Sequence, residues 1–95
     1  MSSNKEQLRK AVFGRLRSLR RKLSAQGIPC AYARSVLSHD DGENGYRITY
    51  HVGNNGDATL LPQISIRTGE AIEEFDSTNF EQGLGRLREL FHVEA

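Results

Sequence analysis

An apolar stripe near the start of the chain limits its fold more than any other feature of the sequence. The stripe consists of Leu8, Val12, Leu16, Leu19 and Leu23. At 100° per residue, these spacings fall within about 80° of a helix, so the stripe must face a core or a partner. Gly27 and Pro29 predict the end of the helix, because Gly suits the left-handed C-terminal position and Pro cannot continue a helix. We therefore expect a helix over residues 5–26 and disorder over residues 1–4.

The middle of the chain has the period of two that is typical of strands. Residues 46–52 alternate apolar side chains with Arg, Thr and His, which predicts a half-buried strand. Residues 30–38 and 60–67 predict two more strands, and residues 71–75 a short fourth strand or a loop. Pro62 has no N–H to donate, so it predicts a bulge or an open sheet edge at that point.

Turn-forming residues separate these strands and imply short antiparallel connections. Residues 39–45 and 53–56 are rich in Gly, Asn and Asp, and Thr68-Gly69 predicts a tight turn. Successive strands joined in this way form a meander, one face of which the two helices can cover.

A second helix closes the chain. Phe80, Leu84, Leu87 and Phe91 recur at helical spacing, and residues 78–81 (TNFE) have the spacing of a capping box. Gly83 borders this apolar stripe, which suggests close approach of another element. We predict a single α+β domain over residues 1–95. It is an antiparallel three- to four-stranded meander with an N-terminal and a C-terminal helix, α-β-β-β-(β)-α, packed on one face.

The composition narrows the class of protein. The chain has 95 residues, 37% of them hydrophobic, and no apolar run reaches the roughly 20 residues of a membrane span. Cations interrupt the N-terminal segment, which therefore does not resemble a secretory signal. Cys30 is the one cysteine, so the chain has neither a disulfide framework nor a zinc-binding cysteine pair. We expect a cytoplasmic protein.

The charge distribution is the strongest functional signal. Residues 1–35 carry nine Lys or Arg against one acid, a net +8. Residues 36–95 carry four Arg against eleven acids, a net −7. Such asymmetry points to an anionic partner. It is equally what a protein shows when its acidic part covers its basic part.

The basic residues of the first helix predict a binding surface. Arg9, Lys10, Arg17, Arg20 and Arg21 lie away from the apolar stripe. Arg suits bidentate contacts with phosphate or carboxylate groups, so we expect a non-enzymatic protein that engages nucleic acid or an acidic protein surface. The alternative is a set of solvating charges, partly neutralised by Glu70, Glu73, Glu74 and Asp76 or by a symmetric mate.

A second class of function is a protein-interaction module. Its working surface would be the acidic region over residues 70–76, as in an inhibitor, immunity or adaptor protein of phage or mobile-element type. Such a module could also be a homodimer. Tyr46 and Tyr50 could stack on bases, but they share a strand face with Ile48 and Val52, which favours core packing.

The α-β-β-β-α order resembles that of double-stranded RNA-binding domains. Those domains share a Lys-Lys-x-x-Lys cluster at the start of the last helix, whereas residues 78–82 (TNFEQ) contain no cation. The sequence therefore argues against that function.

Signals of catalysis are weak. His39, Asp40, Asp41 and Glu43 could bind a metal or transfer protons, but acids in a Gly- and Asn-rich turn are ordinary turn chemistry. Cys30 would be a nucleophile only with a His nearby. We predict no catalytic residues, no metal site and no cofactor.

Overall fold

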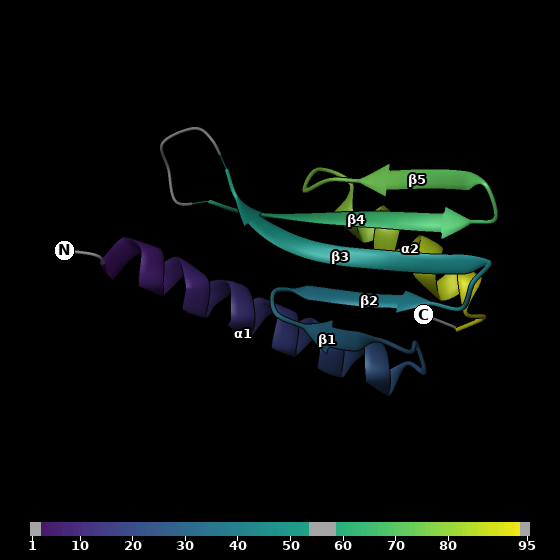
Figure 1. The fold of residues 1–95 in the computed structure, drawn as a ribbon, viewed down its shortest axis with the longest axis horizontal. Coiled ribbons are helices and arrows are strands. Elements are labelled where there is room, and N and C mark those ends of the chain that lie inside the picture. The colour runs from purple at the N-terminus through teal and green to yellow at the C-terminus, as the bar shows by residue number, and fades with distance from the viewer. Residues whose placement is uncertain (1–2, 54–58, 94–95) are drawn as a thin grey trace.

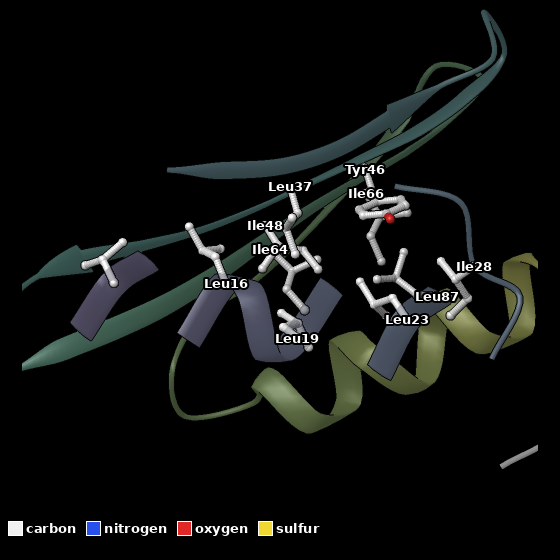
Figure 2. Close-up of a cluster of buried hydrophobic side chains, with 11 residues drawn as sticks. Leu16, Leu19, Leu23, Ile28, Leu37, Tyr46, Ile48, Ile64, Ile66 and Leu87 are labelled. Carbon is white, nitrogen blue, oxygen red and sulfur yellow. The ribbon is translucent and has the colours of Figure 1, made fainter. Parts of the chain in front are cut away.

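The computed structural model describes residues 3–53 and 59–93. Its elements, in chain order, are α1 (Ser3–Ala25), β1 (Ala31–Ala33), β2 (Val36–Asp40), β3 (Asn44–Val52), β4 (Leu60–Thr68), β5 (Ala71–Phe75) and α2 (Phe80–Leu90). The strands form one antiparallel sheet in the order β1-β2-β3-β4-β5. Both helices lie on the same side of this sheet (Figures 1 and 2). The predicted α+β class, the meander and the one-sided helical layer are confirmed.

Helix α1 starts earlier than expected and ends as expected. It begins at Ser3, while residues 1 and 2, part of the segment expected to be disordered, lie outside the described residues. At its C-terminus, Gly27 has a φ of +84° and its N–H donates to the Ser24 carbonyl, while the Ile28 N–H donates to the Leu23 carbonyl at 2.9 Å. These two bonds form a Schellman motif, and the Leu23 and Ile28 side chains are both buried in the core.

The sheet has five strands where the sequence suggested three or four. The segment predicted as one strand over residues 30–38 is a hairpin, in which Ala33 pairs with Val36 across the two-residue turn Arg34-Ser35. Arg34 adopts a φ of +56° there. Tight hairpin turns of this kind favour Gly or Asn, and because neither is present, the sequence carries no turn signal.

The loop between β2 and β3 is shorter than the predicted residues 39–45. The ladder runs as far as the pair Asp40–Gly45, and the Asp41 carboxylate accepts from the Asn44 N–H at 2.6 Å. The Arg67 guanidinium of β4 donates to the Asp40 carboxylate at 2.8 Å and to the Glu43 carbonyl at 2.9 Å. These bonds fix the loop to the sheet.

The register explains how Pro62 fits into the interior of the chain's longest hairpin. Pro62 pairs with Tyr50 of β3, while β5 reaches only as far as the pair Ile64–Phe75. At Pro62, β4 is therefore a local sheet edge among the described strands, as predicted, and no bulge interrupts the register. Most of the turn predicted over residues 53–56 lies outside the described residues.

The core fills the space between the sheet and the helices (Figure 2). Its buried members are Val12, Leu16, Leu19, Leu23, Ile28, Leu37, Tyr46, Ile48, Ile64, Ile66 and Leu87. Four of the five residues of the predicted stripe on α1 are among them, and Leu8 is half-buried. Burying each such side chain stabilises the fold by about 1.5–3 kcal/mol.

Helix α2 packs closely on β4 and β5, as Gly83 suggested. A Cβ atom at Gly83 would lie 2.8 Å from the Ile64 Cδ1 and 2.9 Å from the Phe75 Cγ, so only glycine fits. The predicted capping box is wrong. The N-cap is Asn79 and makes no side-chain cap bond. The Thr78 hydroxyl instead donates to the Asp76 carboxylate, because this acid lies two residues away in the preceding turn.

Candidate anion-binding surface

Helix α1 exposes a dense row of cations. From residue 9 to residue 22, every Lys and Arg of α1 is exposed. These cations are Arg9, Lys10, Arg15, Arg17, Arg20, Arg21 and Lys22. The ion pairs found among the described residues use Arg67 and Arg86 as their cations, so none of the seven takes part in one.

The helical period sorts the five predicted binding residues into two groups. Lys10, Arg17 and Arg21 fall within about 40° of one another, opposite the buried stripe; we call them the outer basic face. Between Lys10 and Arg21 this face is about 16 Å long at 1.5 Å per residue. Arg9 and Arg20 lie on one flank of α1, so the structure separates them from the outer face.

Several of the acids bind partners away from α1. Glu73 of β5 accepts from the Arg86 Nε at 2.9 Å, and this contact raises the pKa of the Arg86 guanidinium. The Gly42 N–H and the Arg67 guanidinium lower the pKa of Asp40. The hydroxyl and N–H of Thr78 lower the pKa of Asp76. These acids stabilise turns and α2, and in the part of the chain that is described no acid forms an ion pair with the basic helix.

The N-terminal half of α1 runs past the ends of β1 and β2 (Figure 1). A groove adjoins the helix there. It has a volume of about 490 Å³ and three walls: α1, the β1–β2 turn and the end of β3. Its lining residues are Arg9, Val12, Phe13, Arg34, Ser35, Tyr50, His51 and Val52. We call this the α1–β3 groove. Its volume lies within the range of small-ligand sites, about 300–1,000 Å³.

Aromatic side chains and cations meet in this groove. Phe13 contacts Tyr32 of β1, with their ring centroids 6.5 Å apart, and Tyr50 contacts Phe80 at 6.2 Å. Burial raises the pKa of the Tyr50 hydroxyl, and a tyrosine hydroxyl can both donate and accept a hydrogen bond. Arg9 contributes positive charge from α1, and Arg34 contributes it from the β1–β2 turn.

Several of these residues were not singled out in the sequence. Phe13 lies about 100° from the middle of the apolar stripe. A large aromatic residue outside the stripe could have indicated a site at the surface of the helix. Arg34 and His51 carried no signal, because their position in the groove depends on a hairpin that the sequence does not mark.

The cluster of His39, Asp40 and Asp41 does not form one site. The His39 ring packs on the helical side of the sheet, 5.6 Å from the Phe91 ring, whereas Asp40 binds Arg67. Within residues 3–53 and 59–93, no group of three His, Cys, Asp or Glu residues is arranged to hold a metal ion.

Cys30 packs against the core as a half-buried thiol. Its neighbour Tyr46 is buried and donates its hydroxyl to the Pro29 carbonyl at 2.7 Å, and burial raises the pKa of that hydroxyl. The interpretation of Tyr46 as a core residue is confirmed. Tyr50 is only half-buried and reaches the groove.

Comparisons with protein-family models, curated proteins and solved structures found no match for the chain. None of the described helices has the length and apolar character needed to cross a membrane.

Proposed function

We propose that the protein binds nucleic acid through the outer basic face of α1, without catalysing a reaction. The observation that carries this proposal is the absence of ion pairs, among the described residues, to any of the seven exposed cations from Arg9 to Lys22. Arg17 and Arg21 are like charges at i,i+4, which weakens an isolated helix. A cost of this kind is offset when phosphates lie between the two charges.

The dimensions of the outer basic face suit a phosphate backbone. Successive phosphates of one DNA strand advance about 3.4 Å along the duplex axis, so a face about 16 Å long spans four to five of them. Neutralising phosphates with Arg and Lys releases counterions, which gives affinity without reading base sequence. The proposed activity is therefore binding with little sequence preference.

Charge reversal on the outer face tests the proposal. Arg17→Glu/Arg21→Glu should lower the affinity for a labelled oligonucleotide by about a hundredfold or more at low salt. Its melting temperature should stay unchanged, because both side chains are exposed and form no described ion pair. Fluorescence anisotropy and circular dichroism measure the two quantities.

The matched control is Arg15→Glu/Lys22→Glu, which makes the same charge change on the other flank of the same helix. We expect a loss of about tenfold or less from the change in total charge. Equal losses from the two double variants would show that net charge, and not the outer face, determines binding.

A second candidate is supported by the exposed edge of the sheet. Ile72 of β5, the last strand of the sheet, is 64% exposed. It lies between the exposed Glu70 of the preceding turn and the exposed Glu74 of β5. Such an edge could add a strand from a basic partner protein, as in an inhibitor, immunity or adaptor protein. Two copies pairing through β5 would bring their acids together, so this edge does not favour the homodimer, which stays a prediction.

Binding to an oligonucleotide at low salt separates the two candidates. Under the first, binding is strong and falls steeply with added salt. Under the second, or if α1 engages an acidic protein surface, the oligonucleotide does not bind. A cytoplasmic location remains part of the proposal and is based on the single Cys30.

A further inference from the structure

We infer that the α1–β3 groove takes one unstacked nucleotide, so that the preferred ligand is single-stranded nucleic acid. In this arrangement the base lies against Phe13 and its phosphate contacts Arg9 and Arg34. The inference rests on the proposed function, because the outer basic face would hold the neighbouring phosphates of the same strand.

The shape of the groove favours a single strand. A base within a duplex is stacked and paired, so it cannot enter a concave site without being extruded. Single strands, by contrast, are commonly bound by a basic surface that follows the backbone and by aromatic rings on which bases stack. The α1–β3 groove combines both features, with Arg9 and Phe13 from α1 and Arg34 from the β1–β2 turn.

Each aromatic ring of the groove contacts a second ring. Phe13 contacts Tyr32, which is 36% exposed, while Tyr50 is held by Phe80. Supported rings lose little conformational entropy when a base stacks on them. Val52, 42% exposed, extends the apolar part of the groove, so two of the three large hydrophobic residues that are exposed in the described chain lie in or beside it.

Arg34 is the least expected residue of the groove. It has a φ of +56°, a conformation that is unfavourable for a residue with a side chain and readily adopted by glycine. Departures from local preference are concentrated at functional sites. Here the residue that replaces a turn glycine or asparagine places a guanidinium on the groove.

His51 and Ser35 complete the polar lining. His51 is exposed and can donate a hydrogen bond to a phosphate or a base edge. Ser35 can donate or accept through its hydroxyl. Neither group selects a particular base, which agrees with binding of low sequence preference.

The test compares a single strand and a duplex of equal length, with 2-aminopurine in the strand to report stacking. Arg34→Gly removes the cation and suits the positive φ, so the fold should be kept or stabilised. Phe13→Leu removes the ring and keeps an apolar side chain. We expect each variant to lose about fivefold or more in single-strand affinity and in 2-aminopurine quenching, with duplex affinity changed less than twofold.

Two conservative variants act as controls. Arg34→Lys keeps the charge and Phe13→Tyr keeps the ring, so both should retain single-strand affinity better than Arg34→Gly and Phe13→Leu. Melting temperatures identify any loss that is due to unfolding.

The outcomes separate this inference from the proposed function. If Phe13→Leu and Arg34→Gly bind single strands as the wild type does, while Arg17→Glu/Arg21→Glu does not, the groove inference is wrong and the outer face remains the site. A wild-type protein that binds duplex as tightly as single strand would also overturn it. If no oligonucleotide binds at low salt, the proposed function fails and the groove inference with it.

Discussion

The two helices of this protein perform the same structural role but use their charges differently. Leu16 of α1 and Leu87 of α2 are both fully buried beneath the sheet. In α2, Arg86 is held by Glu73 of β5 and by Glu89 of the same helix, at 2.9 and 3.2 Å. In α1, the cations from residue 9 to residue 22 form no such pair among the described residues.

This difference separates the charges that stabilise a helical protein from those that do not. A charge that is paired within the fold contributes to the fold, and its loss should lower stability. Exposed like charges without partners oppose folding slightly, so their loss should leave stability unchanged or raise it. The sequence presents the opposite charges of the two parts of the chain as possible mutual partners. Within residues 3–53 and 59–93, they form no ion pair with each other along α1.

Substituting a glycine in each helix should give the largest difference between the helices in the free energy of unfolding. Gly83→Ala should destabilise the protein by about 1–3 kcal/mol, because its Cβ would overlap Ile64 and Phe75. Gly14→Ala in α1 should stabilise it by up to about 1 kcal/mol, since the added Cβ would meet no atom within 4 Å beyond its chain neighbours and the adjoining helix backbone. Urea unfolding of both variants measures these changes, and a loss of stability in Gly14→Ala would show that α1 also approaches another element closely.

Neutralising a single arginine should change stability less than the glycine substitutions do. It tests directly whether the charges of α2, and not those of α1, contribute to the fold. Arg86→Gln should lower the urea midpoint, because it breaks the contacts with Glu73 and Glu89. Arg17→Gln, with the same chemical change on α1, should leave the midpoint unchanged or raise it. Should Arg17→Gln prove as destabilising as Arg86→Gln, the cations of α1 would be structural and the comparison would be wrong.

The elements that follow from local spacing could be predicted from the sequence. The stripe on α1, the Schellman end at Gly27 and the alternation in residues 46–52 depend on neighbouring residues, and the structure agrees with each of them. The predicted close approach at Gly83 is also confirmed. In each case the local conformation or packing requires a particular residue type, such as glycine where φ is positive or where two elements come close together.

The remaining features depend on contacts between distant segments. The hairpin turn at Arg34-Ser35 lacks turn residues, so pairing of β1 and β2 with the rest of the sheet must impose it. Before α2, the N–H and hydroxyl of Thr78 donate to the Asp76 carboxylate, so Thr78 does not form the capping box that the sequence pattern predicts. The α1–β3 groove joins residues 9–13, 34–35 and 50–52, and no local pattern in the sequence connects these three segments.

The salt dependence of binding most directly tests the claim that the cations of α1 are available to phosphates. The measurement is the slope of the logarithm of the association constant for a DNA duplex against the logarithm of salt concentration. For the wild type we predict a steep negative slope, and for Arg17→Gln a slope shallower by about 0.9, the contribution of one phosphate contact. Arg47→Gln, an exposed arginine on β3, should leave the slope unchanged. A slope that is the same in Arg17→Gln and the wild type, or no binding at low salt, would contradict the account.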